Sequence, residues 1–518
     1  MTKTCSNLSI GLLLVSMVLA SCTEDDSYIA EQLIPGITID PLTADNTFTV
    51  VSFQGNRLEI SPVVNTAYNE DELSFDWYLI DKGAEPLTTY NEGDPVTFDR
   101  THIDTGRQLS YEVNLTPGQY TLVLEVKANN GYTVSQTATV NVVTDFSQGF
   151  YIMKETADGH TELDLLNTSG NVFLQNVITS VYGTPIDGRP LCLSTARSHC
   201  YIDTVTNTTA SANLVTVTTQ DGQLYGMRTS DLRCVFNRQS LLFTDMADDE
   251  VPYRIVSGMW GNYLVSSRGL RFQYDTSMQG LADSGKYGLE SEMGASPYVA
   301  YDDTSSSLFF WDETSHSIGI CDYNGSTTVA QDDRYQLSGL SRMTCVAVGY
   351  NSPTGYIVFV LSSLDGSQRQ LVLISPSFSG GIEVKEMRAL RVNKVNTARL
   401  FTVSCASAAL LYGVVGNTIY GLDLTTFTEQ EITPKGIGED EQIVYFSNQS
   451  GGIFGSYDYL VVGTQTQGTD AYTLRFYNQL GGLPDGEPVY TLHGTGTPRA
   501  IHYTEQQAYA FSTIPLQD

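Results

Sequence analysis

The feature that most constrains this chain is a strand–turn–strand pattern that recurs through its C-terminal part. In each copy an apolar run of strand length leads into a short polar turn and a second apolar run, as in Tyr356–Leu361, Asp365–Gly366 and Leu371–Ile374. Asp-Gly suits such turns because both residues tolerate the backbone angles of a tight hairpin. The turns are centred at residues 158, 221, 268, 313, 365, 417 and 470.

The spacing of these turns predicts the fold of residues 146–518. The copies recur every roughly 45 to 63 residues, close to the repeat of a four-stranded propeller blade. A further strand precedes most pairs, for example Ile255–Gly258 and Tyr298–Tyr301. We therefore predict an all-β chain whose C-terminal domain is a seven-bladed β-propeller, with eight blades as the alternative. Segments Arg499–Tyr503 and Ala508–Phe511 are expected to pair with the first blade and close the ring, and the pattern leaves open whether one strand or two is lent.

Residues 33–145 predict a separate all-β unit. Phe75, Trp77 and Leu79 alternate with more polar neighbours, which is the pattern of a strand with one buried face. Asn129–Gly131 separates two longer strand-like runs and favours a tight hairpin. A domain of this length, with short strands and a tryptophan on a middle strand, is typical of an Ig-like β-sandwich. We expect Trp77 to be a core residue.

The N-terminal segment 1–21 has the organisation of a secretory signal peptide. Lys3 supplies a positive charge, and the apolar run Ile10–Ala20 leads through small residues to Cys22. This run is shorter than the ~20 residues that a bilayer-spanning helix needs. The quartet Leu19–Cys22 resembles the lipobox of bacterial lipoproteins. The resemblance implies that Cys22 carries acyl chains such as palmitate and becomes the first residue of the mature chain.

Residues 22–32 are acidic, weakly apolar and without periodicity, which predicts a solvated tether. The run Thr23–Ser27 also resembles the surface-export signal of lipoproteins from gut-type Gram-negative bacteria. That resemblance implies an outer-membrane protein, held by its lipid anchor and facing the cell exterior.

Composition limits the classes of partner. The 518 residues include 58 acidic and 27 basic side chains, for a formal net charge of −31. A chain of this charge repels phosphate backbones, and no Lys/Arg cluster with interleaved aromatics occurs, which argues against a nucleic-acid partner. Charged residues form 16% of the chain, below the ~25% of ordinary soluble domains. Uncharged polar residues and 31 tyrosines take their place, as expected of an extracytoplasmic β-protein.

The cysteines predict neither a metal site nor a cofactor. Beyond Cys22 they are Cys192, Cys200, Cys234, Cys321, Cys345 and Cys405. No C-x-x-C occurs and no histidine is placed to complete a zinc site. Cys321, Cys345 and Cys405 lie in strand-like apolar runs, where a free thiol packs as a small apolar group. The spacing leaves open whether Cys192 and Cys200 form a disulfide.

Common catalytic motifs are absent from the sequence: there is no H-E-x-x-H, G-x-S-x-G, P-loop or EF-hand spacing. Neighbouring carboxylates such as Asp302–Asp303 and Asp248–Glu250 recur, but solvated turns explain such pairs in a chain with 58 acidic residues. No catalytic residue is assigned, and whether the chain is an enzyme stays open.

One turn combines an aromatic ring with hydrogen-bonding groups. Trp311, Asp312 and His316 fall between the second and third strands of the fourth repeat, and Arg268 falls in the same turn of the third. These turns lie on the propeller face that carries the loops between blades. Since an aromatic face beside polar groups can hold a sugar ring or a peptide side chain, these four residues are the candidate ligand site. The alternative is that Trp311 packs between blades. Trp260 falls on the opposite face by the same reasoning.

Pro117–Leu122 followed by Lys127–Gly131 resembles the penultimate hairpin of PKD-like domains. A PKD-like module, a propeller and a lipoprotein stem together resemble the PKD-like family lipoproteins, which are associated with TonB-dependent nutrient importers and their substrate-binding surface lipoproteins. The resemblance implies an accessory role in capturing or degrading peptides or glycans.

Three functional hypotheses follow. The first is a surface-displayed lipoprotein that binds an extracellular glycan, peptide or partner protein beside a TonB-dependent importer. The second is a hydrolase or lyase acting on polysaccharide or peptide, which requires convergent carboxylates or a His/Tyr/Arg set around the central channel. The third is a structural or adhesive subunit. A flat channel mouth without aromatics favours the third hypothesis, whereas a cleft lined by Tyr and Trp favours a small ligand.

Overall fold

The computed structural model describes most of the chain from residue 35 to residue 504. The described residues are 35–52, 56–81, 99–115, 118–168, 170–204, 208–274, 285–288, 291, 293–302, 305–332, 334–335, 337–340, 342–377, 381–451 and 457–504. The predicted signal peptide (1–21), Cys22 with its tether (22–32), and the segment 508–511 lie outside them. The chain divides into two compact units, Met1–Val142 and Val143–Asp518.

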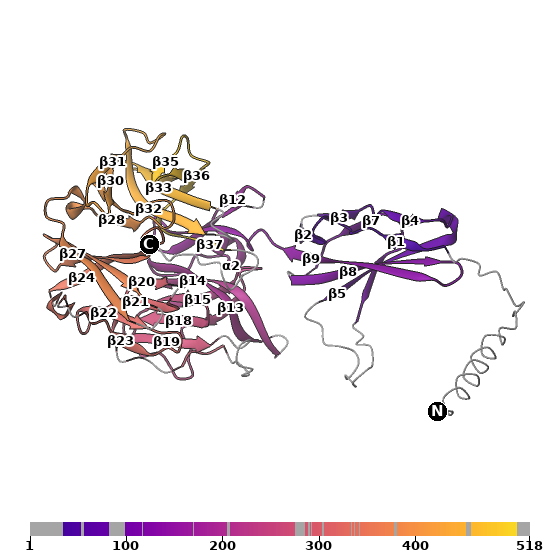
Figure 1. Cartoon of the computed structure of the whole chain (residues 1–518), viewed down its shortest axis with the longest axis horizontal. Helices are drawn as coiled ribbons and strands as arrows, with labels where there is room; N and C mark the ends of the chain where they lie inside the picture. The colour runs from indigo at the N-terminus through magenta and orange to yellow at the C-terminus, as the bar shows by residue number, and fades with distance from the viewer. Residues whose placement is uncertain are drawn as a thin grey trace, which may run out of the picture. The chain divides into compact units, whose positions relative to one another are not determined.

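The first unit is a β-sandwich. Its strands are β1 (Ile37–Ile39), β2 (Thr47–Val51), β3 (Arg57–Ile60), β4 (Val64–Thr66), β5 (Leu73–Asp81), β6 (Thr101–Asp104), β7 (Leu109–Glu112), β8 (Gly118–Ala128) and β9 (Thr133–Val143), with a 3-10 turn at Glu70–Glu72. A five-stranded sheet in the order β2-β9-β8-β5-β6 accompanies the two-stranded ladders β1-β4 and β3-β7. Figure 1 shows these strands as two layers.

The core of the sandwich confirms the alternation predicted for β5. Phe75, Trp77 and Leu79 are buried, and they pack with apolar residues of β7, β8 and β9. The indole Nε1 of Trp77 donates to the carbonyl oxygen of Gly106 at 2.7 Å, which satisfies its buried polar group. β8 and β9 form the predicted hairpin through Asn129–Gly131, where Gly131 takes φ = +89°.

The second unit consists of sheets formed from strands β10 to β37. The strands are β10 (Gly149–Glu155), β11 (Thr161–Asn167), β12 (Val172–Leu174), β13 (Pro190–Asp203), β14 (Thr208–Thr219), β15 (Leu224–Arg228), β16 (Cys234–Asn237), β17 (Pro252–Ser257), β18 (Gly261–Ser266), β19 (Gly269–Tyr274), β20 (Ala295–Asp302), β21 (Ser307–Asp312), β22 (Ser317–Cys321), β23 (Thr327–Val329), β24 (Met343–Asn351), β25 (Tyr356–Ser363), β26 (Arg369–Pro376), β27 (Ile382–Ala389), β28 (Leu400–Val403), β29 (Leu410–Val415), β30 (Thr418–Asp423), β31 (Glu429–Ile432), β32 (Glu441–Gly451), β33 (Tyr457–Thr466), β34 (Ala471–Leu480), β35 (Leu483–Pro484), β36 (Tyr490–Thr495) and β37 (Thr497–Thr504). Short helical turns are α2 (Val177–Tyr182), Leu337–Leu340 and Lys394–Thr397.

Within the described residues these strands make seven antiparallel sheets, and all but the first, which also contains β37, are built from strands that follow one another along the chain. The first strands of six sheets, β13, β17, β20, β24, β28 and β32, together with β37, contact one another in sequence around a complete ring. Figure 1 shows the sheets radiating from this ring. The second unit is therefore a β-propeller, and the all-β prediction is confirmed.

The ring is closed by the last described strand. β37 pairs with β10, the first strand of the unit, in an antiparallel ladder that places Ile501 opposite Ile152. β36 pairs instead with β34 of the preceding sheet. The described C-terminal region therefore contributes one strand to the first blade. The sequence had left open whether one strand or two would do so, and for the residues up to Tyr503 the number is one.

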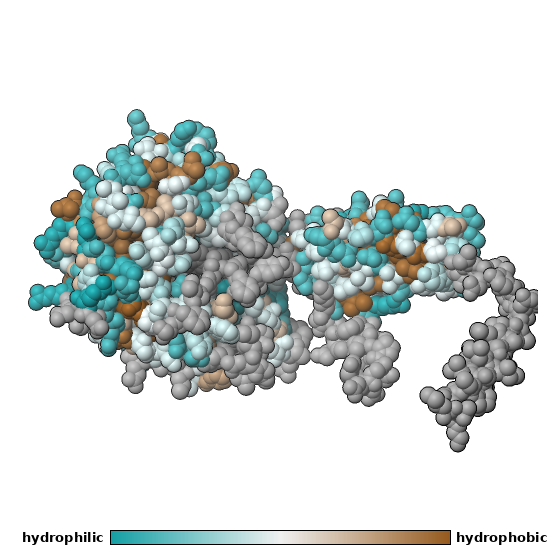
Figure 2. Space-filling model, viewed as in Figure 1, coloured by the Kyte–Doolittle hydropathy of each residue, from teal (hydrophilic) through white to brown (hydrophobic). Residues whose placement is uncertain are grey.

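Apolar packing between sheets holds the ring together. All six residues of β21 are buried, because both faces of the strand are covered by neighbouring blades. Large apolar side chains exposed to solvent are scattered, and on the face seen in Figure 2 they form separate small patches among hydrophilic residues. In the described part of the chain, no helix combines the length and the apolar character needed to cross a bilayer.

Candidate functional site

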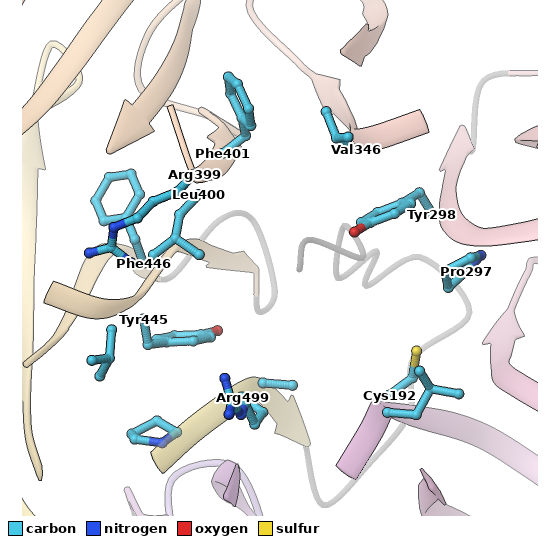
Figure 3. Close-up of a pocket in the computed structure, with 14 residues that line it drawn as sticks. Cys192, Pro297, Tyr298, Val346, Arg399, Leu400, Phe401, Tyr445, Phe446 and Arg499 are labelled. Atoms are coloured by element: carbon cyan, nitrogen blue, oxygen red, sulfur yellow. The ribbon is translucent and has the colours of Figure 1, made fainter. Parts of the chain in front are cut away.

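The mouth of the propeller channel contains a cavity of about 270 Å³. Its wall is built where β13, β20, β24, β28, β32 and β37 begin, so the cavity lies on the axis of the ring (Figure 3). Because the inner strands all enter from this face, it is also the face of the turns between second and third strands. A concave site at the meeting point of several rigid elements is the usual location of a ligand site.

Part of the wall comes from β-bulges at the beginnings of the inner strands. In each bulge the inner strand carries more residues than the partner strand, so the extra residues leave the ladder and their side chains are re-aimed. The extra residues are Leu191 in β13, Tyr253 in β17, Ser296–Tyr298 in β20, Val346 in β24, Val444 in β32 and Arg499 in β37. All of these strands except β17 contribute bulge residues to the cavity wall.

Two tyrosines bring hydroxyl groups into this wall. Tyr298, from the bulge of β20, and Tyr445, from β32, point their hydroxyls toward the middle of the cavity from opposite sides (Figure 3). Tyr445 is 4% exposed, and its neighbour Phe446 is 2% exposed, so both rings are fixed by packing. The cavity therefore combines aromatic surfaces with tyrosine hydroxyls, which can donate or accept hydrogen bonds, and the hydroxyl of Tyr445 is itself buried.

The rim carries positive charge. Arg499 donates from Nε and Nη2 to Glu155 Oε2 at 3.1 and 2.6 Å, and Glu155 also pairs with Arg189. Arg399 donates to the backbone carbonyls of Gly416 and Ile443, and none of the described residues forms an ion pair with it. Partial burial lowers the pKa of Arg399, since desolvation disfavours its charged form.

The described lining residues include these two arginines and no carboxylate, in a chain with more than twice as many acidic as basic residues. The cavity mouth is thus locally suited to a ligand that carries negative charge next to a ring or an apolar body.

Cys192 also lines the cavity, with its sulfur pointing upward in Figure 3. The guanidinium Nη2 of Arg254, a residue only 1% exposed, donates to Cys192 Sγ at 3.2 Å. Cys192 and Cys200 lie on the same strand, opposite Thr218 and Ser211 respectively. At ~3.3 Å per residue the two cysteines are roughly 25 Å apart, far beyond the ~4.4–6.8 Å that a disulfide allows. No disulfide joins any two of the described cysteines.

The candidate site predicted around Trp311 lies outside this cavity. Trp311 is fully buried and packs with Phe309, Ile318 and Val372, so its ring offers no face to a ligand. This is the packing alternative that the sequence left open. Asp312 is 2% exposed and accepts hydrogen bonds from the backbone N–H groups of Thr314 and Ser315, which makes it a turn-forming residue.

His316 and Arg268 lie on the same face in neighbouring turns. His316 takes φ = +48° and is partly buried, whereas Arg268 is exposed and pairs with Asp249 at 2.5 Å. Gly294 separates the two turns, since a Cβ atom there would lie 2.5 Å from Thr314 Oγ1 and 3.6 Å from the Ser267 carbonyl. The structure brings the turns close together, and ligand binding by Asp312, His316 and Arg268 stays a prediction.

Sequence reasoning missed the residues of the cavity. The first strand of each blade was visible only as an additional apolar run, and a bulge leaves no periodic signature. The pairing of a basic residue with aromatics at the start of such a run, as in Arg399–Phe401, is the signal that was available. Among the described residues no group of three or more His, Cys, Asp or Glu side chains is placed to hold a metal ion.

Comparison with known proteins finds a family match for part of the chain. Residues 37–190 match the PKD-like family, a span that covers the sandwich and the beginning of the second unit. No curated protein matches the chain.

Among solved structures, a quinonprotein alcohol dehydrogenase-like protein from Bacteroides thetaiotaomicron is similar at 13% identity and a TM-score of 0.42, over 90% of this chain and 99% of that one. The dihydro-heme d1 dehydrogenase NirN matches at 10% identity and a TM-score of 0.37, over 70% of this chain and 76% of that one. A DUF4784 family protein from Bacteroides caccae matches at 10% identity and a TM-score of 0.30, over 77% and 96%.

Proposed function

We propose that this chain is a surface-displayed lipoprotein that captures an extracellular glycan or peptide at the mouth of its propeller channel and works beside a TonB-dependent importer. The observation that carries the binding role is the cavity itself. Side chains from six inner strands converge there, and they include Tyr298, Tyr445 and two arginines. In this proposal the sandwich serves as a spacer between the membrane and the propeller.

The cavity favours a small ligand over a flat protein contact. Its wall is concave and aromatic, with hydroxyls opposite each other and positive charge at the rim. Tyrosine hydroxyls can pair with sugar hydroxyls or peptide groups, and an arginine can bind a carboxylate in bidentate fashion. The ligand that fits best is therefore a glycan or peptide segment with a carboxylate near a ring or apolar group.

A ligand array tests the binding role. A soluble form starting at Thr23 is applied to neutral glycans, acidic glycans and short peptides, and each hit is measured by calorimetry. We expect a hit whose affinity falls when Tyr298 or Tyr445 is replaced by Phe. If neither substitution changed the affinity, the ligand would bind elsewhere and the assignment of the cavity would be wrong.

The anchor rests on the lipobox-like sequence and is tested separately. Stable lipid anchoring needs more than one acyl chain, so a Cys22→Ala variant should leave the membrane fraction. Protease treatment of intact cells then reports whether the chain faces outward. A Cys22→Ala protein that stays with membranes would rule out the lipid anchor.

The importer partnership in this proposal comes from the family resemblance. Importer genes beside the gene for this chain, and co-purification of an importer with the detergent-solubilised lipoprotein, are the expected results. Neighbouring genes for glycan hydrolases or peptidases would indicate the class of ligand.

A second candidate function is a lyase or hydrolase, and one observation favours it. The cavity holds part of the His/Tyr/Arg set that this hypothesis requires, namely two tyrosines and two arginines. A tyrosine hydroxyl can serve in general acid–base catalysis, and an arginine can neutralise a substrate carboxylate. Formation of new reducing ends or of unsaturated products from any bound glycan would replace the binding function with an enzymatic one.

A further inference from the structure

Two aromatic rings are exposed side by side on the propeller face opposite the cavity. Trp260 lies in the turn between β17 and β18, and Tyr323 lies in the turn between β22 and β23 of the next blade. Their exposed fractions are 37% and 49%, and their ring centroids are 6.1 Å apart with an angle of 48° between the planes. The chain's other tryptophans, Trp77 and Trp311, are fully buried.

The two turns are held in place by reciprocal hydrogen bonds between the blades. The hydroxyl of Tyr301, at the end of β20, accepts from the backbone N–H of Met259 at 2.9 Å. The hydroxyl of Tyr263, at the start of β18, donates to the backbone carbonyl of Asp322 at 3.1 Å. Each blade thus provides a buried or half-buried tyrosine that hydrogen-bonds the turn of the other blade. These bonds fix the positions of the two turns that carry the exposed rings.

Each turn is also rigid by itself. Gly258 N–H donates to the Gly261 carbonyl at 2.8 Å, which closes a tight turn around Trp260. Asp322 Oδ1 accepts from the N–H groups of Asn324 and Ser326 at 2.8 and 2.9 Å. Little conformational entropy is then lost when a ligand stacks on the rings, because they are already positioned.

The surroundings identify the chemistry of the ligand. The residues of the two turns, Gly258–Gly261 and Asp322–Ser326, carry a single charged side chain, that of Asp322, and backbone groups already occupy its Oδ1. The exposed polar groups beside the rings are neutral, with Asn324 and Ser326 at the surface. This combination suits the C–H face of a sugar ring together with its hydroxyls, and it offers nothing to an ionic ligand.

The size of the platform also favours a sugar over a protein. A standard protein interface buries ~800 Å² on each partner, whereas an aromatic side chain supplies at most ~150–250 Å² when fully covered. We propose that Trp260 and Tyr323 form a second binding site, which takes a neutral pyranose ring of a glycan chain by stacking. The site lies on the face opposite the channel mouth, so its existence does not depend on the ligand of the cavity.

Tryptophan fluorescence gives a direct test, because Trp260 is the tryptophan that solvent can reach. The soluble form starting at Thr23 is titrated with neutral hexasaccharides of cellulose, xylan, mannan and starch type, with hexagalacturonate, and with a neutral hexapeptide. Acrylamide quenching and calorimetry are recorded in each case. We expect at least one neutral hexasaccharide to protect Trp260 from the quencher.

Variants separate this site from the cavity. Trp260→Ala and Tyr323→Ala should each weaken binding of that hexasaccharide about tenfold or more, while Trp260→Phe retains most of it. Phe243→Ala, at an exposed aromatic on another loop, is the matched control and should bind as the parent does. Thermal unfolding of all variants confirms that they fold.

The outcomes decide between this site and its alternatives. A protected Trp260 whose protection persists in Tyr298→Phe supports a second site and is informative even if the cavity binds nothing. Protection by the peptide or by hexagalacturonate alone, absence of protection by every neutral glycan, or unchanged hexasaccharide affinity in Trp260→Ala and Tyr323→Ala would overturn the proposal.

Discussion

Gly149 and Thr504 lie opposite each other in the ladder between β10 and β37, so the beginning of the propeller and its last described residue are paired neighbours. The ladder joins segments that are distant along the chain, and it converts an open row of blades into a ring. Closure of this kind removes two exposed sheet edges at once.

The closing strand should control the stability of the propeller. A chain that ends at Gly496 lacks β37 and exposes the edge of β10, whereas a chain that ends at Thr504 retains the strand. We expect the shorter chain to lose cooperative thermal unfolding or to melt roughly 10 °C lower than the longer one. The reason is that removing β37 removes several core contacts at once. Equal melting temperatures for the two truncations would show that β37 does not close the ring.

His199 should make the propeller sensitive to acid. The ring is fully buried, packs against Phe236 and Tyr287 at centroid distances of 4.9 and 6.0 Å, and neither ring nitrogen has a hydrogen-bond partner among the described residues. Burial lowers the pKa of His199 to about 3. In the unfolded chain the pKa is ~6.5, so between these values the unfolded state binds a proton that the folded state does not.

The free energy of unfolding should therefore fall as pH drops below ~6.5, by about 2 kcal/mol at pH 5 from this residue. Urea unfolding of His199→Phe and of the parent, measured from pH 7 to pH 4.5, isolates the effect, since all other groups cancel in the difference. Parallel curves for the two proteins would contradict the assignment.

A buried ion pair in the first blade is joined to the last blade by a tyrosine. Lys154 Nζ lies 2.8 Å from Asp164 Oδ1, and the two side chains are 1% and 0% exposed. Asp164 also accepts from the Asn176 N–H and from the hydroxyl of Tyr472 on β34. Burial, followed by the charge of Asp164, raises the pKa of Tyr472, so its hydroxyl remains a donor.

Removing one partner should cost more than removing both. Lys154→Met leaves an uncompensated buried carboxylate and is expected to lower the free energy of unfolding by about 3–5 kcal/mol. Adding Asp164→Asn should recover part of that loss, and a double-mutant cycle in urea measures the coupling. Additive effects of the two substitutions would mean that the pair does not interact.

Each tyrosine hydroxyl at the cavity should contribute separately to ligand affinity. Tyr298→Phe and Tyr445→Phe each remove a hydrogen-bonding group while keeping the ring, so each should weaken the cavity ligand about fivefold, the effect of losing one neutral hydrogen bond. Tyr132→Phe, at an exposed tyrosine of the first unit, is the matched control. If His316→Ala and Arg268→Gln weakened binding and the cavity variants did not, the turns on the same face would be the ligand site instead.

The thiol count should show no disulfide. Alkylation of the denatured mature chain without reductant is expected to modify Cys192, Cys200, Cys234, Cys321, Cys345 and Cys405. Mass spectrometry reads the number directly, and two thiols missing from the count would indicate a bond that this fold does not allow between Cys192 and Cys200.

Much of the fold could be predicted because apolar residues and turn residues recur at regular intervals in the sequence. The alternation at Phe75, Trp77 and Leu79 predicted a buried strand face, and the spaced turns predicted the propeller. The same reasoning could not decide whether Trp311 was a surface or a core residue, since it stands next to a turn at the end of β21. Its burial depends on the neighbouring blade, which no local pattern describes.

The cavity could not be predicted for a different reason. Its shape depends on bulges in strands that are otherwise regular, and Val346 or Val444 looks in sequence like any strand residue. Likewise, the contact between Trp260 and Tyr323 requires two turns from different blades to meet. The cavity depends on the pairing register of the inner strands, and the aromatic pair depends on how neighbouring blades are arranged in the ring. Neither can be deduced from a local sequence pattern.

The bulges have a consequence for how such a propeller changes its specificity. Leu191, Val346 and Val444 stand outside the pairing registers of their strands, and their side chains form part of the cavity wall. Substitutions at these positions alter what the wall presents and leave the ladders that hold the blades intact. At these three positions recognition is separated from strand pairing, so the scaffold can change its ligand there at little cost in stability.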